Sequence, residues 1–230
     1  MVNVASFGAA AGRGSVHGER VASGTRERRR GGPAPAGVLA LQGDFAKHLE
    51  AYACFGVPTR EVRSVADLEG LSSLTIPGGE STTLLRLIED TGLRPALGAF
   101  VATHPVFGTC AGAILLGRGG AGLPEPPFGV LDAEVTRNAY GRQVDSFEAD
   151  VDAPVLPGES RFRAVFIRAP RFGRTGPGVE IVARRGGETV GVRQGHILAL
   201  AFHPELTDDV RFHRWFLETV AGVPAVPEAR

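Results

Sequence analysis

The sequence contains no long hydrophobic run, few cysteines and no net charge. No apolar stretch approaches the roughly 20 residues that a membrane-spanning helix needs, so we expect no membrane partner. Its two cysteines, Cys54 and Cys110, cannot form a disulfide framework, and no group of cysteines and histidines has metal-ligand spacing, so we expect no bound metal. With 25 basic and 25 acidic residues and 43% hydrophobic residues, the 230-residue chain has the composition of a globular protein with one sizeable α/β domain.

The first 36 residues differ from the rest of the chain in charge and pattern. They hold six arginines against two glutamates, are rich in glycine, alanine and serine, and show no sustained hydrophobic period. We therefore predict a disordered extension over residues 1–36. The basic run at residues 26–30 could be a nucleic-acid-binding arm, but a solvated tail is the favoured interpretation, and we expect no nucleic-acid partner. The segment lacks the apolar core of a secretory signal; an organelle transit peptide and a start site assigned too far upstream remain open.

From residue 37 onward, short apolar runs alternate with helical patterns. We predict strands at 37–41, 57–62, 71–76 and 106–107, and helices at 44–55, 81–90 and 111–116. Asp44 is expected to cap the first of these helices, and Cys54 near its end is expected to lie in the core. Strand alternating with helix at this interval predicts βαβ units and a parallel sheet.

After Gly117 the pattern changes mostly to strand. We predict strands at 130–135, 146–151, 162–167, 179–183, 189–193 and 197–202, with a hairpin turn at 185–188 and a closing helix at 208–220. No internal repeat is present. These elements predict one domain over residues 37–222, a three-layer α/β/α sandwich with a mixed, mostly parallel sheet, followed by a C-terminal tail at 223–230.

Cys110 lies where an apolar run ends and a predicted helix begins. Its surroundings read Phe107-Gly108-Thr109-Cys110-Ala111-Gly112. A Gly-x-Cys-x-Gly pattern at such a junction is typical of a nucleophile elbow with cysteine in place of serine. Side chains at the two glycine positions would crowd this strained turn, and the N–H groups that open the helix would favour the reactive thiolate. A buried structural cysteine is the alternative, which the spacing disfavours. The setting suits a reducing compartment, so we expect a cytoplasmic protein.

A cysteine nucleophile needs a base, and the base needs a group that orients it. Histidines occur at positions 17, 48, 104, 196, 203 and 213. His203 stands out because Pro204 and Glu205 follow it directly after an apolar run. In an extended segment residues i and i+2 point to the same side, so His203 could deprotonate Cys110 while Glu205 holds the imidazole. We expect the other histidines to be solvated, packed or in loops.

A second glycine motif, Pro77-Gly78-Gly79-Glu80-Ser81-Thr82, follows the predicted strand at 71–76. Ligands bind at the carboxyl ends of the strands in an open parallel sheet. The paired glycines let backbone N–H groups approach a ligand closely, as an oxyanion hole requires. Alone, the motif would be a turn with Ser81 as a helix cap. Beside the elbow, an oxyanion hole is the favoured interpretation.

Taken together, these segments resemble a known family. The sequences PGGESTT at 77–83, FGTCAG at 107–112 and FHPELT at 202–207 resemble the class I, or triad, glutamine amidotransferases. Within that superfamily, GVLALQG at 37–43, RNAYGRQVDSFE at 137–148 and VFIRAP at 165–170 resemble the glutaminase subunits of pyridoxal 5′-phosphate synthase. The resemblance covers about residues 37–220, whereas the first 36 residues have no counterpart in the family's pattern.

This resemblance implies that L-glutamine is hydrolysed to L-glutamate and ammonia through a γ-glutamyl thioester on Cys110. His203 would then act as base and afterwards as acid, and Glu205 would orient it. The oxyanion hole would be formed by the N–H groups of Gly79 and Ala111. The positions implied to bind glutamine are Gly79, Glu80, Ser81, Arg137, Ile167 and Arg168. An arginine guanidinium suits the α-carboxylate of that substrate.

The resemblance also implies a protein partner. Ammonia would pass through a tunnel into a (β/α)₈-barrel synthase subunit that builds pyridoxal 5′-phosphate, so this compound is a product of the complex and we expect no cofactor on this chain. Two alternatives stay open at this point. One is a stand-alone γ-glutamyl hydrolase or cysteine peptidase, which shares the elbow and the histidine. The other is a catalytically silent subunit that only scaffolds or regulates a synthase.

Overall fold

The structure, a computed structural model, describes residues 33–137 and 146–225, all of which belong to one compact unit. The predicted extension at 1–36 therefore lies almost wholly outside the described residues. The same holds for most of the predicted tail at 223–230 and for residues 138–145 of the RNAYGRQVDSFE motif. Among the described residues, no helix is long and apolar enough to cross a membrane.

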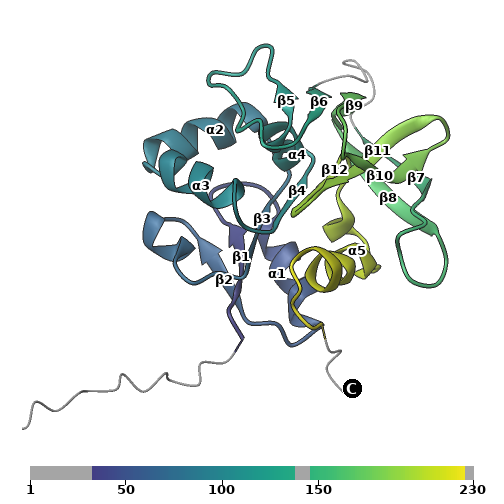
Figure 1. Ribbon diagram of the computed structural model, residues 1–230, viewed down its shortest axis with the longest axis horizontal. Helices are drawn as coiled ribbons and strands as arrows, with labels where there is room; N and C mark the ends of the chain where they lie inside the picture. The colour runs from purple at the N-terminus through teal and green to yellow at the C-terminus, as the bar shows by residue number, and fades with distance from the viewer. Residues whose placement is uncertain (1–32, 138–145, 226–230) are drawn as a thin grey trace, which may run out of the picture. The chain divides into compact units, whose positions relative to one another are not determined.

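The described strands form two sheets (Figure 1). Nine strands make the main sheet, in the order β2-β1-β3-β4-β12-β11-β10-β7-β8, and three make a small sheet, in the order β5-β6-β9. In chain order the strands are β1 (Ala36–Leu39), β2 (Thr59–Val62), β3 (Ser73–Ile76), β4 (Val106–Thr109), β5 (Arg118–Gly119), β6 (Ala133–Thr136), β7 (Ser146–Asp152), β8 (Arg161–Ile167), β9 (Arg171–Thr175), β10 (Glu180–Arg185), β11 (Glu188–Gln194) and β12 (Ile197–Leu200).

The main sheet is mixed, as predicted. The five strands from β2 to β12 run parallel to one another, whereas β11, β10, β7 and β8 continue the sheet in antiparallel pairs. The parallel strands β1, β3, β4 and β12 are buried at every position. Parallel strands covered on both faces read as continuous apolar runs, which is why the sequence indicated them clearly. Their carboxyl ends meet at one edge of the sheet.

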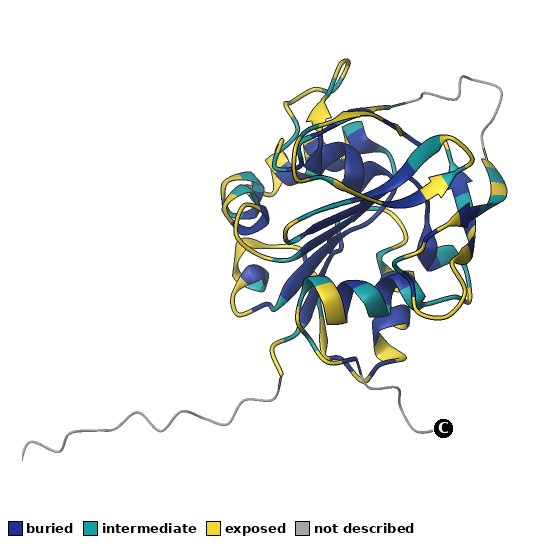
Figure 2. Ribbon diagram, turned by 45° about the vertical axis from the view of Figure 1, so that its right-hand side comes forward, coloured by how far each residue is buried: buried dark blue, intermediate teal, exposed yellow. Residues whose placement is uncertain are grey.

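Helices cover both faces of the parallel strands, which confirms the predicted three-layer α/β/α arrangement (Figures 1 and 2). Helices α1 and α5 contact each other on one face, and α2 contacts α4 on the other. The helices are α1 (Phe45–Ala53), α2 (Ser81–Asp90), α3 (Arg94–Val101), α4 (Ala111–Leu116) and α5 (Arg211–Trp215), with 3₁₀ turns η1 (Val65–Leu68) and η2 (Pro204–Leu206) and a π-helical turn η3 (Phe216–Val220). The predicted helices at 81–90 and 111–116 have the predicted bounds.

Several elements differ from the prediction. Helix α3 was missed because it has no side-chain N-cap and contains both Pro95 and Gly98. The small sheet was also missed: β9 buries only Phe172 of its five residues, so it shows no alternation of apolar and polar residues. The closing helix begins at Arg211 rather than 208 and ends in the π-helical turn.

Two predictions about side chains of the first helix were wrong. Asp44 occupies the N-cap position of α1, but its side chain makes no capping hydrogen bond. Cys54 is exposed rather than in the core. It follows the last residue of α1, where the chain has left the buried face of the helix, and its thiol donates to the carbonyl of Glu50 at 3.5 Å.

Candidate active site

Cys110 lies on a strained turn between β4 and α4. Its φ of 48° and ψ of −102° are unfavourable for any residue with a Cβ. The turn is held because the Cys110 N–H donates to the Leu200 carbonyl at 2.9 Å and the Cys110 carbonyl accepts from the Ile114 N–H at 3.2 Å. The predicted nucleophile elbow is therefore the local structure, at the edge of the sheet where the carboxyl ends of the parallel strands meet.

Gly108 and Gly112 are required by close packing around this turn. A Cβ on Gly112 would lie 2.1 Å from the Ile76 carbonyl oxygen, and one on Gly108 would lie 2.8 Å from the Gly112 carbonyl carbon. Backbone atoms cannot move aside as a flexible side chain could. The sequence interpretation was right that these positions need glycine. The atoms that would clash belong to β3 and α4, and not to the cysteine side chain.

His203 and Glu205 contact each other in η2, just beyond β12. The distance from His203 Nδ1 to Glu205 Oε1 is 2.7 Å, and both residues are buried. The predicted reason for this contact was wrong, because Pro204–Leu206 forms a 3₁₀ turn and not an extended segment. Phe202 anchors the turn by packing against Phe162, Phe166 and Phe212, with ring centroids 5.5 to 5.8 Å apart.

The His203 ring is also fitted against the glycine motif after β3. A Cβ on Gly78 would lie 2.2 Å from His203 Cε1, so only glycine admits the imidazole there. The His203 N–H donates to the Val165 carbonyl at 2.8 Å, which ties the same residue to β8. Segments from β3, β8 and β12 thus fix the position of this one side chain.

Electrostatics favour a charged histidine and a charged glutamate in this pair. Burial alone would lower the pKa of His203, but the neighbouring Cys110 and Glu205 raise it from 6.5 to about 10. Burial alone would raise the pKa of Glu205, but His48 and His203 hold that pKa well below its ordinary value. Glu205 therefore stays an anion, as a group that orients an imidazole must.

Two more histidines lie behind Glu205 in the layer between the sheet, α1 and α5. His48 Nε2 lies 3.4 Å from Glu205 Oε2, and His48 Nδ1 lies 2.9 Å from His213 Nε2. Both rings are fully buried. The sequence interpretation treated both as solvated or packed side chains. One signal was available: His48 lies four residues before Tyr52, on the face that was expected to point inward.

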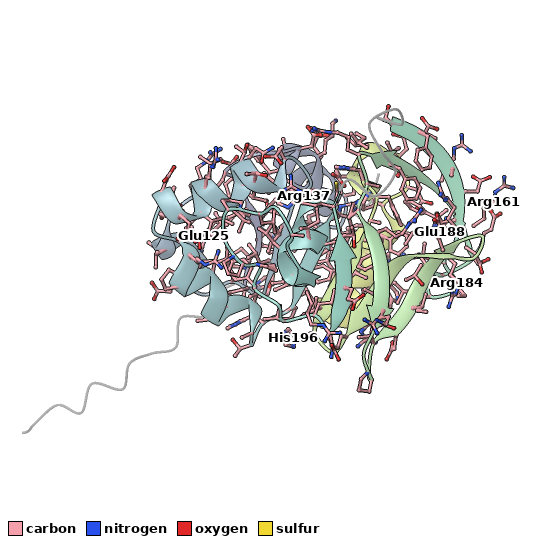
Figure 3. The ribbon with its side chains drawn as sticks, turned by 90° about the horizontal axis from the view of Figure 1, so that it is seen from above. Glu125, Arg137, Arg161, Arg184, Glu188 and His196 are labelled. Carbon is pink, nitrogen blue, oxygen red and sulfur yellow. The ribbon has the colours of Figure 1, made fainter. Side chains whose placement is uncertain are left out.

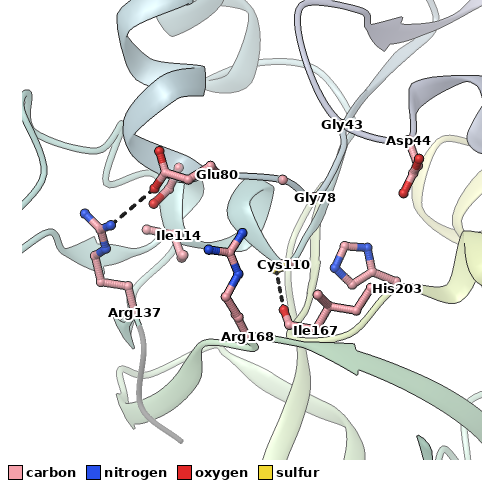
Figure 4. A pocket seen from close by; sticks show the side chains of 12 residues that line it. Gly43, Asp44, Gly78, Glu80, Cys110, Ile114, Arg137, Ile167, Arg168 and His203 are labelled. Carbon is pink, nitrogen blue, oxygen red and sulfur yellow. Dashed lines mark hydrogen bonds and ion pairs between the residues drawn. The ribbon is translucent and has the colours of Figure 1, made fainter. Parts of the chain in front are cut away.

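A pocket of about 140 Å³ opens in front of Cys110 and His203 (Figure 4). Its lining residues are Gly43, Asp44, Gly78, Gly79, Glu80, Ser81, Cys110, Ile114, Arg137, Ile167, Arg168 and His203. Eight predicted site residues are among them. The other two, Ala111 and Glu205, lie behind the pocket wall at the start of α4 and behind His203.

The pocket also includes residues that the sequence interpretation did not assign to the site. Gly43 and Asp44 come from the loop after β1, and Ile114 lies one turn into α4. The loop after β1 had a usable signal. The loop follows a parallel strand. The carboxyl end of that strand had to lie on the same edge of the sheet as the elbow, and so did the loop.

Glu80 caps α2 and holds one of the two predicted arginines. Its carboxylate accepts from the N–H of Thr82 at 3.1 Å and from that of Thr83 at 2.7 Å, and Arg137 Nη2 lies 3.3 Å from Oε1. Burial would raise the pKa of Glu80, but the N–H groups of Thr83 and Thr82 lower it overall. Glu80, and not Ser81, is therefore the helix cap.

The carboxamide of Gln42 holds the backbone of Glu80 from the side of β1. With Oε1 facing the Glu80 N–H at 2.8 Å and Nε2 facing the Glu80 carbonyl at 3.0 Å, both polar atoms are paired. Gly79 has a φ of 142°, and a Cβ there would lie 2.5 Å from the same carboxamide. The strand ends at β1 and β3 are thus joined beside the pocket.

Besides Cys110, Arg168 is the other described residue that has a positive φ without being glycine, and its φ is 42°. No described residue supplies an acceptor for its guanidinium, which Figure 4 shows extending toward the space between Glu80 and Cys110. The preceding carbonyl, that of Ile167, accepts from the Cys110 thiol at 3.7 Å.

Figure 3 shows Arg161, Arg184 and Glu188 toward the antiparallel end of the sheet, away from Arg137.

Of the two predicted oxyanion donors, Ala111 directly follows Cys110 and Gly79 lines the same pocket. Ala111 is the first residue of α4, so its N–H has no carbonyl partner within the helix. Gly79 directly precedes the cap of α2 and lines the pocket. Among the described residues, no cluster of three or more histidine, cysteine, aspartate or glutamate side chains could hold a metal ion.

Comparisons with known proteins agree with one another. The family model described as SNO glutamine amidotransferase family matches residues 38–222. A pyridoxal 5′-phosphate synthase subunit PdxT of Thermus thermophilus is 56% identical over 190 residues, which cover 81% of this chain and 97% of that protein. PdxT of Pelotomaculum thermopropionicum is 55% identical, with 79% and 93% covered. A crystal structure of a glutamine amidotransferase has 52% identity and a TM-score of 0.75, with 82% of this chain and 99% of that chain covered.

Proposed function

The chain belongs to the SNO glutamine amidotransferase family, and from this membership we propose that it is the glutaminase subunit of a pyridoxal 5′-phosphate synthase. It hydrolyses L-glutamine to L-glutamate and ammonia and delivers the ammonia to a partner subunit. One structural observation carries the proposed chemistry. Cys110 on its strained turn after β4 comes together with His203, against the pocket, and Glu205, behind His203, which both belong to the turn after β12.

The pocket suits an amino acid with a long amide side chain. The exposed guanidinium of Arg168, unpaired among the described residues, and the partly buried guanidinium of Arg137 offer a site for the α-carboxylate, since arginine pairs well with carboxylates. Glu80, whose pKa is lowered, offers negative charge for the α-ammonium group. Gly79, Ser81 and Ile167 complete the wall between these charges and the cysteine.

In the first half of the reaction, the Cys110 sulfur attacks the carbon of the side-chain amide. His203 holds the proton of the Cys110 thiol during this attack, and the negative charge that develops on the amide oxygen is stabilised by the N–H groups of Gly79 and Ala111. His203 then gives its proton to the departing nitrogen. The carbon–nitrogen bond breaks, ammonia leaves, and a γ-glutamyl thioester remains on Cys110.

In the second half, water attacks the thioester. His203 accepts a proton from the water and returns it to the sulfur as the carbon–sulfur bond breaks, so that glutamate is released and the thiol is restored. Glu205 stays ionised throughout and stabilises the imidazolium each time it forms. The Ile167 carbonyl lies on the other side of the sulfur and accepts from the Cys110 thiol at 3.7 Å.

The ammonia is consumed elsewhere, because this chain supplies only the hydrolysis. The family resemblance supports a (β/α)₈-barrel synthase subunit as the partner, with the cofactor assembled there and not bound by this chain. A subunit of this kind needs its partner in order not to waste glutamine. We therefore expect hydrolysis to be slow for the free chain and fast for the complex.

The two cysteines provide an internal control for testing this proposal. Cys54 is exposed and Cys110 is buried, so a general alkylating reagent should modify Cys54 first. An electrophilic analogue of glutamine, applied to the complex with the barrel subunit, should instead modify Cys110. Peptide mapping by mass spectrometry distinguishes the two. Modification of Cys54 alone by the glutamine analogue would contradict the proposed nucleophile.

A further inference from the structure

The Glu205 carboxylate uses only one of its two oxygens to hold His203. Oε1 accepts from His203 Nδ1 at 2.7 Å, whereas Oε2 is buried and makes no hydrogen bond of good geometry with any described residue. A buried carboxylate oxygen without a donor is costly, because water cannot replace the missing partner. The nearest nitrogen is Nε2 of His48, at 3.4 Å. This places His48 on the opposite side of Glu205 from His203.

The hydrogen bonds around His48 determine where its proton lies. Its Nδ1 lies 2.9 Å from His213 Nε2, so one of these two nitrogens must carry a proton and the other must accept. Burial, with the nearby His48, lowers the pKa of His213 to about 3, so this ring is neutral. His213 Nδ1 has no partner among the described residues. A bare nitrogen is tolerated there more easily than an unsatisfied N–H, so the His213 proton belongs on Nε2.

This arrangement sets the proton of a neutral His48. If His213 donates from Nε2, His48 Nδ1 is the acceptor and the His48 proton lies on Nε2, which faces Glu205 Oε2. The opposite tautomer would turn a lone pair of His48 toward a carboxylate in a buried site. The Thr109 hydroxyl, 3.4 Å from the same nitrogen, is the other neighbour and can accept as well.

The surrounding rings keep His48 and His213 in these orientations. Phe107 of β4 meets the two imidazoles edge-on, with ring centroids 6.1 and 5.7 Å away, and Tyr52 of α1 meets His213 at 5.5 Å. The ionisable groups that face the pair are therefore Glu205, Tyr52 and, beyond Glu205, His203 and Cys110. Burial raises the pKa of Tyr52, so its hydroxyl stays neutral and Tyr52 adds no negative charge to this group of side chains.

We propose that His48, held by His213, is a positioning residue that donates from Nε2 to Glu205 Oε2 and so fixes the carboxylate that orients His203. The hydrogen-bonded series then runs from Cys110 through His203, Glu205 and His48 to His213. The 3.4 Å separation is longer than a strong hydrogen bond, and such contacts commonly shorten when substrate is bound. The predicted effect on kcat rests on the proposed glutaminase function, whereas the hydrogen-bond geometry is independent of that function.

The tautomer can be tested without any activity measurement. In protein labelled with ¹⁵N at histidine, the nitrogen shifts and long-range proton couplings distinguish Nδ1–H from Nε2–H for each ring. We expect the Nε2–H form for both His48 and His213, with assignments from His48→Gln and His213→Gln spectra. A His48 ring protonated on Nδ1 alone would overturn the proposal, because no donor would then face Glu205.

The kinetic test compares three variants in the complex with the barrel subunit. His48→Phe keeps the ring volume but removes both nitrogens, and we expect kcat to fall about 10- to 100-fold with KM nearly unchanged. His48→Gln retains an N–H near the position of Nε2 and should recover most of the lost kcat. Tyr52→Phe removes the buried Tyr52–Thr75 hydrogen bond in the same layer and should leave kcat unchanged. Thermal unfolding of each variant measures the loss of stability separately.

The outcomes separate this inference from the proposed function. Wild-type complex that releases no glutamate from glutamine would contradict the function, while the tautomer measurement would still decide the inference. Active wild type together with wild-type kcat in His48→Phe would overturn the inference alone. If His48→Phe fails to fold, the kcat of His48→Gln and the ¹⁵N measurement of the tautomers test the proposal instead. A His48→Gln variant as inactive as His203→Gln would contradict a donor role for His48.

Discussion

His203 Nδ1 lies 2.7 Å from Glu205 Oε1 although only Pro204 separates the two residues, and this short 3₁₀ turn places the glutamate directly behind the imidazole. We expect Glu205→Gln to lower kcat by about 10² to 10⁴-fold, because the amide keeps the shape of the side chain but cannot balance an imidazolium. Glutamate release from the complex measures this. Glu180→Gln, an exposed glutamate of β10, is the matched control and should retain full activity. Equal activity in both variants would contradict the role of Glu205.

The raised pKa of His203 predicts how stability depends on pH. The folded protein binds a proton at His203 up to a pKa of about 10, whereas the unfolded chain releases it near 6.5. The contribution of this proton to the free energy of unfolding is therefore complete below pH 6.5 and is lost as the pH rises toward 10. Denaturant unfolding of wild type and His203→Gln should show a stability difference that shrinks across this range. His104→Gln, at an exposed histidine, is the matched control for the loss of a histidine side chain. A difference that grows with pH would contradict the assigned shift.

Arg168 combines a positive φ with a guanidinium that we propose binds the substrate carboxylate, so substitution should separate stability from binding. With a φ of 42°, Arg168→Gly should raise the free energy of unfolding by about 1 kcal/mol. The same change should raise KM for glutamine about tenfold or more, since a charged hydrogen bond is lost. Arg168→Lys keeps the strain and part of the charge, so its stability should match wild type and its KM should be intermediate. A destabilised Arg168→Gly variant would show that the conformation is not strained.

Gly112 tests the packing of the elbow against β3. A Cβ on this residue would lie 2.1 Å from the Ile76 carbonyl oxygen, so we expect Gly112→Ala to destabilise the protein by about 1 to 3 kcal/mol and to lower activity. Gly187, in the turn between β10 and β11, has no atom within 4 Å of its Cβ position and provides the control. Chemical denaturation of both alanine variants gives the comparison. A Gly112→Ala variant as stable as Gly187→Ala would contradict the close approach.

Local signals were enough to predict the parallel strands and the two glycine motifs at the pocket, whereas Arg137, Ile167 and Arg168 came only from the family resemblance. The strands that carry Cys110 and the Gly78–Gly79 pair are buried on both faces, so they appear as short apolar runs that end in glycine motifs. Because parallel strands present their carboxyl ends at one edge, the motifs had to meet there. The glycines on either side of Cys110 also indicated the strained turn in which Cys110 has a positive φ.

The parts that the sequence did not reveal depend on contacts between distant elements. His48 is one histidine on a helix until α5 packs against α1 and brings His213 to 2.9 Å. The positive φ of Arg168 has no sequence signal, because arginine rarely adopts it. The small sheet depends on backbone pairing of β9 with β6, and its exposed, charged residues show no apolar period.

The most direct measurement is the release of ammonia and glutamate from glutamine by the purified chain, alone and with increasing amounts of the proposed partner synthase subunit. Cys110→Ala runs alongside, with binding to the partner checked by analytical ultracentrifugation. We expect slow release by the free chain, strong stimulation by the partner, and no release by Cys110→Ala even though it still binds. Equal rates with and without the partner would point to an independent hydrolase, and substantial release by Cys110→Ala would contradict the thioester mechanism.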